Sequence, residues 1–296
     1  MEQTRGYLAI LVASILWGTM GIFGKLAFAY GIDPVTLTAL RILISSSAIL
    51  VFLTLYNRKL LKIEKKDIPL LIVFGLLAVA LQRVAYFYTV DLTTATIAAV
   101  MFYTYPIFIT AHASFFQKEK VTSSVIFAIV LAFIGVALVV RAYEASWLST
   151  NTLGVAFGML TSSLFALYFL MAKRMRNTYT NWTLLLYGDG IGAIAISPAL
   201  VLSSSQIISY PPGLWYLILT ISLVPSVTAY LLFSYGLKYV ESSKGSILSV
   251  IEPLSAAAFS TTILGERFEL LQLAGVALAI VGILLLFYKP RLNSRT

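Results

Sequence analysis

The chain has 296 residues, of which 59% are hydrophobic and only 11% are charged. Soluble domains contain about 45–50% apolar and roughly 25% charged residues, so this composition excludes an ordinary soluble fold. The net charge of +9 would suit a nucleic-acid-binding protein, but the basic residues lie in short connections between apolar runs, so we expect no nucleic-acid partner. The lack of cysteine excludes disulfides, and a single histidine argues against a zinc site. We expect no metal and no cofactor.

Ten apolar segments follow one another along the chain, and each approaches the roughly 20 residues that a helix needs to cross a bilayer. They are continuously apolar rather than alternating, which favours helices over the strands of a barrel. We expect the first helix to be retained, because no small-residue cleavage site follows it. The predicted helices cover approximately residues 7–27, 35–56, 68–90, 95–116, 122–142, 153–172, 181–203, 214–236, 244–264 and 269–288.

The connections between these helices differ sharply in charge. With the N-terminus inside, about sixteen of the 21 Lys and Arg residues lie in or beside inside connections. The outside connections hold only Lys25, Arg141 and Arg267. Cytoplasmic loops carry the excess of positive charge, so we predict that both termini are cytoplasmic.

The two halves of the chain match each other. At an offset of 148 residues Lys25 matches Lys173; at 147 the matches are Tyr88 with Tyr235, Pro106 with Pro253, Glu119 with Glu266, and Gly135 with Gly282. Each half holds an odd number of helices, so the second half must be inverted in the bilayer, as in many transporters. The prediction is an all-α integral membrane protein of two inverted five-helix repeats, residues 1–142 and 153–296, with residues 143–152 as an extracytoplasmic linker.

Short motifs support this arrangement. The first helix carries Trp17-Gly18, and helices 4 and 9 end in Lys118-Glu119-Lys120 and Gly265-Glu266-Arg267. In these features the chain resembles the drug/metabolite transporter superfamily, specifically its EamA family, over essentially its whole length. It departs from the family pattern where Lys118 replaces the usual glycine. The resemblance implies export or exchange of a small polar metabolite, often an amino acid, by alternating access across the cell membrane.

Five ionisable residues lie inside the predicted spans, where charges are costly and usually face a cavity or a partner. Glu252 directly precedes a proline, whose missing N–H leaves the carbonyl of Ser249 without its helical partner. Glu252 or Asp189, which lies among glycines, is a candidate to carry a coupling proton. His112 could also titrate near neutral pH, or could simply be hydrogen-bonded in place.

The two arginines are candidates for binding an acidic group of the substrate, because the guanidinium group suits carboxylates and phosphates. Arg83 is placed deep in helix 3, and Arg41 closer to the outer surface in helix 2. The alternatives are that Arg41 pairs with an acid or that each arginine reaches the interface.

Aromatic residues at mid-depth are candidates to hold the body of a substrate. A buried tyrosine or tryptophan needs a hydrogen-bond partner, whereas interfacial ones are ordinary membrane anchors. The mid-depth candidates are Trp17, Tyr86, Tyr103, Tyr105, Tyr168 and Tyr230. Glycines such as Gly135, Gly275 and Gly282 are expected to allow close helix packing instead.

The sequence contains no G-x-x-x-x-G-K-[ST], H-E-x-x-H or G-x-S-x-G motif, so we expect neither ATP hydrolysis nor these hydrolase chemistries. The hypothesis is a secondary active transporter whose partners are a small-molecule substrate and membrane lipids, with no obligatory protein partner evident. Two alternatives stay open. An enzyme acting on lipid head groups would need clustered acid–base residues, and a passive channel would need continuous polar faces on several helices.

Overall fold

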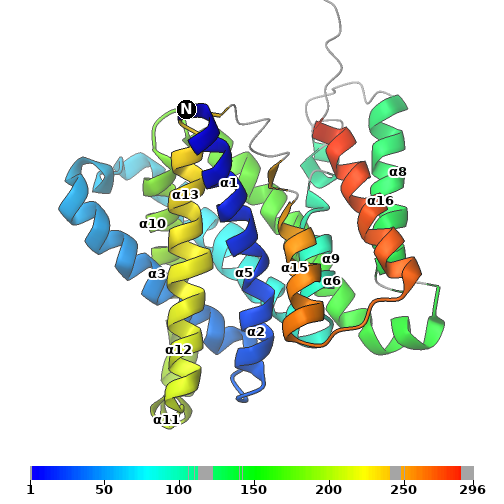
Figure 1. The fold of residues 1–296 in the computed structure, drawn as a ribbon. Coiled ribbons are helices and arrows are strands. Elements are labelled where there is room, and N and C mark those ends of the chain that lie inside the picture. Colours follow the sequence, from blue (N-terminus) through cyan, green and yellow to red (C-terminus); the bar gives the residue numbers. More distant parts are fainter. Residues whose placement is uncertain are drawn as a thin grey trace, which may run out of the picture.

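The computed structural model describes residues 2–105, 107–109, 111–112, 123–139, 141, 143–240, 248–249 and 251–287, and every regular element in these ranges is helical (Figure 1). Within them, six helical stretches are long and apolar enough to cross a membrane, and three shorter apolar helices accompany them. The structure confirms an all-helical, multi-pass membrane protein. The count of ten stays a prediction, because parts of the predicted fourth, fifth and ninth spans lie outside the described residues.

The first repeat is built from long apolar helices joined by short connections. Asp33 starts one of them: its carboxylate accepts the N–H groups of Val35 and Thr36 at 2.9 Å, and Pro34 occupies the first turn, where no N–H is needed. The elements are α1 (Glu2–Gly18), α2 (Met20–Phe28), α3 (Pro34–Tyr56), η1 (Arg58–Leu61), η2 (Lys65–Asp67), α4 (Ile68–Val73), η3 (Phe74–Leu81), α5 (Gln82–Leu92), α6 (Ala95–Phe102) and α8 (Ser123–Val139).

The second repeat has the same succession of helices. Its elements are α9 (Ala145–Met175), α10 (Asn181–Leu202), α11 (Ser204–Ile208), α12 (Pro212–Ile221), η4 (Ser222–Thr228), α13 (Ala229–Gly236), α15 (Ile251–Ile263) and α16 (Leu270–Phe287). α9 begins at Ala145, so residues 145–152 of the predicted linker are helical.

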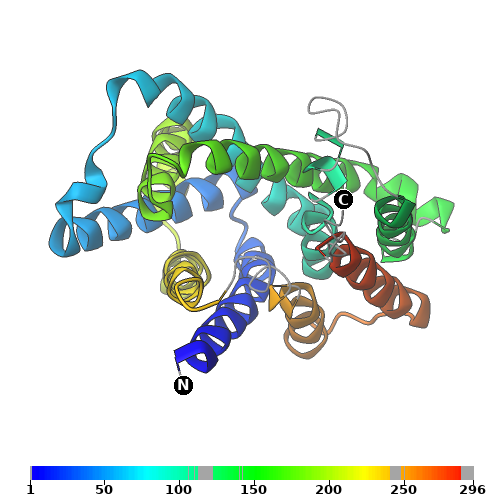
Figure 2. The same ribbon diagram turned by 90° about the horizontal axis from the view of Figure 1, so that it is seen from above.

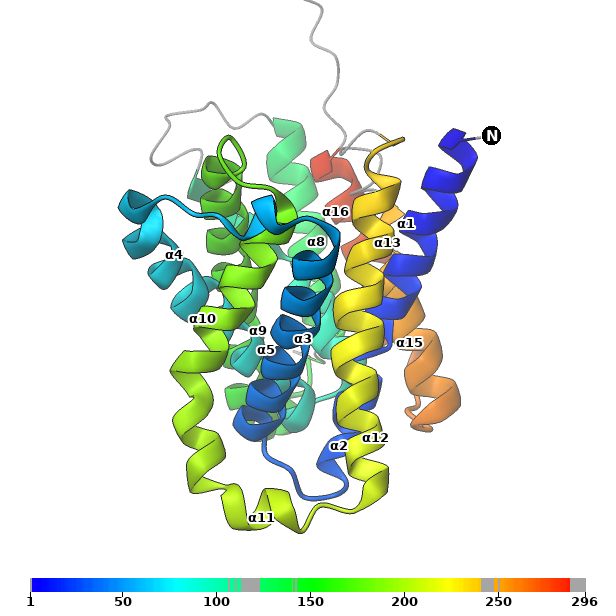
Figure 3. The ribbon, with the colours of Figure 1, turned by 90° about the vertical axis from the view of Figure 1, so that its left-hand side faces the viewer.

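The corresponding helices α3 and α10 pack against each other and run in opposite directions (Figure 3). Near the start of α3, the hydroxyl of Thr36 lies 3.2 Å from that of Ser203, which follows the end of α10. At the other end, Thr183 near the start of α10 donates to the carbonyl of Leu60, beyond the end of α3. This antiparallel arrangement is what an inverted repeat requires. We call the face that holds the N-terminus and the α3–α4 connection the N-terminal face.

Both repeats contain a π-helical segment at the same place. η3 (Phe74–Leu81) continues α4 into α5, and η4 (Ser222–Thr228) continues α12 into α13. The two segments begin 148 residues apart and end 147 residues apart, the same offsets that relate the two halves of the sequence. π-Helical segments are rare and frequently lie at functional sites. Each repeat therefore carries the same irregularity in its third helix.

The predicted fourth helix is interrupted rather than continuous. α6 ends at Phe102, residues Tyr103 and Thr104 form a turn, and helix resumes at Tyr105. The sequence has proline at position 106, which has no N–H to donate to the carbonyl of Phe102, four residues earlier. In the second repeat Ser249, which matches Phe102 at the offset of 147, is a turn residue two positions before α15. Broken helices of this kind bring backbone polar groups into the middle of a membrane protein.

Helices α8 and α16 lie side by side at one edge of the molecule (Figures 1 and 2). Their close approach depends on glycines. A Cβ atom on Gly275 would lie 2.8 Å from the carbonyl oxygen of Gly135, and one on Gly282 would lie 2.8 Å from that of Ala128. The packing role predicted for these glycines is confirmed. The remaining helices pair across the repeats, α1 with α13 and α5 with α9.

Candidate substrate site

An ion pair joins the two repeats at mid-helix. Arg83 Nη1 of α5 lies 2.5 Å from Asp189 Oδ1 of α10. The other carboxylate oxygen accepts a hydrogen bond of 3.0 Å from the hydroxyl of Ser45 on α3. Asp189 is 1% exposed and the Arg83 side chain 15%. From the sequence we expected separate roles for these two residues, whereas the structure brings them together.

The second arginine is buried close by without an acid. Arg41 on α3 is 6% exposed and so lies inside the helix bundle, while its depth in the bilayer relative to Arg83 stays a prediction. Its Nε donates a hydrogen bond of 2.9 Å to the hydroxyl of Ser226 in η4, and its guanidinium carbon lies 5.5 Å from the centre of the Phe87 ring. Among the described residues no carboxylate forms an ion pair with Arg41.

Glu252, in the first turn of α15, is held by the broken fourth helix. The hydroxyl of Tyr103 lies 2.9 Å from Glu252 Oε2 and 2.6 Å from the carbonyl oxygen of Ser249. This carbonyl was predicted to lose its helical partner at the following proline. It accepts from Tyr103 and from the backbone N–H of Glu252. Beside them, the hydroxyls of Thr104 and Ser162 are 2.7 Å apart.

Aromatic rings form one wall of this region. Tyr105 lies edge-on to Phe165 of α9, with ring centres 4.9 Å apart, and Phe165 stacks on Tyr168 at 5.3 Å. Phe102 packs 4.4 Å from the same Phe165. The aromatic surface therefore runs from the break in helix 4 along α9, next to the acid–tyrosine pair.

Tyr86 connects the polar groups. It lies on α5, and it interacts electrostatically with both Arg41 and Glu252. Arg41 in turn interacts electrostatically with Arg83 and Asp189. Five of the charged and tyrosine candidates therefore form one connected set of buried groups, contributed by helices of both repeats.

The other predicted site residues are Trp17, Tyr230 and His112, of which Tyr230 interacts electrostatically with Asp189 and Tyr168. The Trp17 ring packs 5.0 Å from Phe233 in the α1–α13 contact. Tyr230 donates its hydroxyl to the carbonyl of Asn181, at the start of α10. His112 follows Tyr103 by nine residues, toward the end of the described part of helix 4.

Sequence reasoning missed three hydroxyl residues of the set, Ser45, Ser162 and Ser226. Serines are common in apolar helices, where the hydroxyl can bond to the carbonyl of the preceding turn, so the residue type alone does not mark a site. A signal was present for Ser226, which directly follows Pro225 in the middle of a predicted span.

Lys25 was counted only as a topological charge, but it makes a specific contact at the face opposite the N-terminus. Its ammonium group donates to the carbonyl oxygens of Val90, Asp91 and Thr93, all at 2.8 Å. It thus caps the C-terminal end of α5, where carbonyls lack helical partners and the helix dipole favours a cation. The matching residue of the second repeat, Lys173, is exposed.

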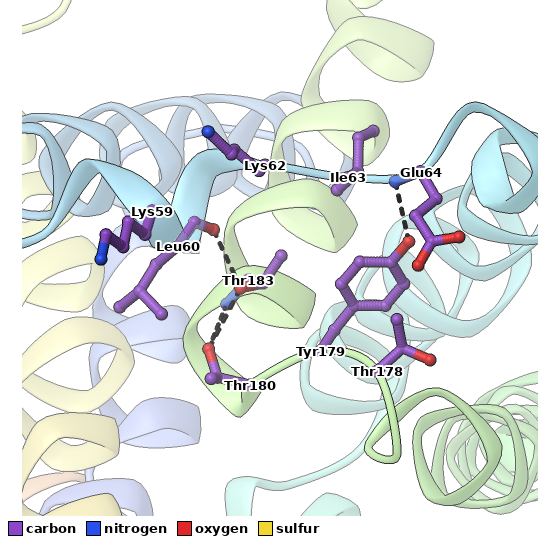
Figure 4. Close-up of a pocket in the computed structure, with 9 residues that line it drawn as sticks. All are labelled: Lys59, Leu60, Lys62, Ile63, Glu64, Thr178, Tyr179, Thr180 and Thr183. Atoms are coloured by element: carbon purple, nitrogen blue, oxygen red, sulfur yellow. Dashed lines mark hydrogen bonds between the residues drawn. The ribbon is translucent and has the colours of Figure 1, made fainter.

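A cavity of about 280 Å³ lies on the N-terminal face between the α3–α4 connection and the start of α10 (Figure 4). Lys59, Lys62 and Tyr179 are among its lining residues. The Tyr179 hydroxyl accepts from the N–H of Glu64 and donates to Asp67, which fastens the connection to the helix end. The cavity is separate from the mid-helix polar groups.

Fold and site together define a multi-pass membrane protein of two repeats with charged groups gathered between them, an arrangement typical of transporters. The model of the EamA-like transporter family matches residues 4–141 and 152–288, one match for each repeat. The chain belongs to the EamA-like transporter family.

Related proteins agree with this family. The chain is 29% identical over 282 residues to an uncharacterized transporter of Archaeoglobus fulgidus, covering 95% of each chain. It is 24% identical to the uncharacterized inner membrane transporter YicL of Salmonella typhimurium, over 100% of this chain and 99% of YicL. A solved crystal structure shares the fold, with a TM-score of 0.63 and 16% identity, over 95% of this chain and 96% of that one. These relatives indicate a transporter of the cell membrane rather than a head-group enzyme.

Proposed function

We propose that this protein is a secondary active transporter that exports an amino acid or a related small polar metabolite by alternating access, coupled to protons. The observation that carries the proposal is the set of buried charged groups contributed by both repeats, with Arg83 bound to Asp189 and Glu252 bound to Tyr103. In a membrane protein such groups mark pathways for substrates or protons.

An amino acid matches the chemistry of the set. Its carboxylate suits an arginine, its ammonium group suits Glu252, and its side chain would lie along the aromatic wall of Tyr105, Phe165 and Tyr168. Tyr86, which interacts with both Arg41 and Glu252, stands between the two charged ends. Glu252 is the proposed proton carrier, because Asp189 is already engaged by Arg83 and Ser45.

Transport is tested with purified protein in liposomes. Flux of each of the common amino acids is measured with and without a pH gradient and with and without internal amino acid. We expect concentrative or exchange flux for at least one of these amino acids. Lipid head-group turnover with no flux would instead support the enzyme alternative.

The role of Glu252 is tested by Glu252→Gln, with Glu64→Gln as the control, because Glu64 is an exposed acid in the α3–α4 connection. Glu252→Gln is expected to abolish pH-driven flux and to leave exchange measurable, whereas Glu64→Gln should keep both. Unchanged pH dependence in Glu252→Gln would remove this residue as the proton carrier.

The orientation that we propose places the N-terminal face in the cytoplasm, since most basic connections lie there. The chain has no cysteine, so single cysteines can be introduced without a background. In intact cells, a membrane-impermeant maleimide should label Ser209→Cys, which follows α11, and should not label Lys62→Cys. The reverse pattern would invert the proposed topology.

A further inference from the structure

The buried charges that interact with Arg41 do not balance. Arg41, Arg83 and Asp189 interact with one another, and together they carry one net positive charge. Both oxygens of Asp189 are already engaged, one by Arg83 and the other by Ser45. Arg41 is left with a neutral hydroxyl, that of Ser226, and the face of an aromatic ring. A cation inside a membrane protein is costly unless an anion compensates it.

The inverted repeat shows where the compensating acid is missing. The π-helical segment η3 of the third helix packs against α10 of the other repeat. Its counterpart in the second repeat, η4 of the eighth helix, packs against α3 in the same way. In the first of these contacts Asp189 meets Arg83. In the second, Arg41 stands 148 residues before Asp189, and Tyr230 stands 147 residues after Arg83. One contact therefore holds an acid and a base, while the other holds a base and no acid.

Among the described residues, the guanidinium group of Arg41 is held through only one of its nitrogens. Only its Nε donates a hydrogen bond to a described side chain, that of Ser226. The two Nη atoms make no hydrogen bond to any described residue. A guanidinium group held by Nε still presents a planar pair of donors, which matches the two oxygens of a carboxylate.

From these observations we propose that Arg41 binds the single carboxylate of the substrate, which takes the place of the acid that the second contact lacks. This inference rests on the proposed function and sharpens it. The substrates that Arg41 would recognise are compounds whose acidic group is a single carboxylate with one negative charge. A phosphate monoester would bring excess negative charge to the trio of Arg41, Arg83 and Asp189, which has one positive charge to spare. Arg83 is a positioning residue that holds Asp189 and binds no substrate.

The structure offers a matched pair of variants. Ser226 Oγ lies 2.9 Å from Arg41 Nε, so Ser226→Asp supplies a built-in carboxylate beside the guanidinium group. Ser226→Asn has nearly the same size and no charge. Any difference between the two variants therefore reports the charge and not the altered packing. Arg58→Gln serves as a further control, because Arg58 is an exposed arginine of η1.

Binding is measured by thermal unfolding of the purified protein with the twenty amino acids and their carboxamides, which differ only in the carboxylate. We expect the wild type to bind at least one amino acid about tenfold more tightly than its amide, the scale of one hydrogen bond to a charged group. Ser226→Asp should lose that preference and melt at a higher temperature than Ser226→Asn, since it neutralises Arg41. Arg41→Gln should lose the preference as well, and Arg58→Gln should keep it.

The outcomes separate this inference from the proposed function. Equal binding of acids and amides by the wild type, or identical behaviour of Ser226→Asp and Ser226→Asn, overturns the role of Arg41 even if transport is observed. Carboxylate binding that Ser226→Asp abolishes supports the role of Arg41 even if liposomes show no flux, in which case only the transporter proposal fails. Phosphoserine and serine are compared in the same assay, and preference for phosphoserine would overturn the single-carboxylate class.

Discussion

Breaking the pair between Arg83 and Asp189 should cost more stability than any other side-chain change in the polar set. Removing one partner of a buried ion pair costs about 3–5 kcal/mol, because the other charge is left uncompensated. Arg83→Gln leaves Asp189, which is 1% exposed, with the hydroxyl of Ser45 and the nearby positive charge of Arg41. Asp189→Asn leaves Arg83 and Arg41 as two interacting positive charges with no acid between them. The second variant should therefore lie at the upper end of that range and the first at the lower end.

The double variant separates pairing from simple packing. With both charges gone, the glutamine and asparagine amides can hydrogen-bond to each other, so the double variant should cost less than either single variant. The cycle should yield a coupling energy of about 3 kcal/mol. Equilibrium unfolding in mixed detergent micelles measures the three costs. Strictly additive costs, or single variants that each lose less than about 1 kcal/mol, would show that the pair behaves as an exposed one and would refute this reasoning.

Three further predictions concern stability, measured by thermal or denaturant unfolding in detergent. Tyr103→Phe removes a hydroxyl that lies within hydrogen-bond distance of two oxygens, and it should lower the free energy of unfolding by about 1–3 kcal/mol. Tyr105→Phe should cost less, because the Tyr105 hydroxyl makes no hydrogen bond to a described residue. Equal losses of stability in the two variants would contradict this prediction. Gly135→Ala places a methyl group 2.7 Å from a carbonyl oxygen of α16 and should lower the free energy of unfolding by about 1–3 kcal/mol. In Gly190→Ala the added methyl group meets nothing within 4 Å, so this variant should be neutral or stabilising. Similar effects of the two substitutions would rule out close packing of α8 against α16. Lys25→Met should cost about 1.5–3 kcal/mol through loss of three bonds to carbonyls, and a variant as stable as the wild type would mean that water replaces the ammonium group.

The sequence was sufficient for the fold because hydropathy and repetition are local or periodic signals. Apolar length marks the spans, and residues such as Pro106 and Pro253 keep a fixed separation between the halves whatever the loops do. Helix boundaries were less secure. α9 begins eight residues before its predicted start at 153, because the polar residues there still allow a helix beyond the apolar segment.

The site was predicted as single residues and not as contacts. Arg83 and Asp189 were both singled out, yet they are 106 positions apart, and no pattern in the chain states that they meet. The burial of Arg41 was not predicted, because distance from a helix end does not reveal which neighbours cover a side chain. The prediction for Ser249 came closer, because a proline removes a specific N–H and so identifies the carbonyl that needs another donor.

The paired π-helical segments also determine which kind of mutation the third and eighth helices tolerate. A π segment accommodates an extra residue relative to an α-helix, and one residue corresponds to a rotation of about 100° around the helix axis. Deleting one residue from η3 would leave the composition of the helix almost unchanged, yet it would turn Arg83 away from Asp189 by about that angle. The same deletion in η4 would rotate the end of its helix that carries Tyr230 relative to the end that begins at Pro212. These two helices should therefore accept many substitutions on their lipid-facing sides and almost no change in residue number.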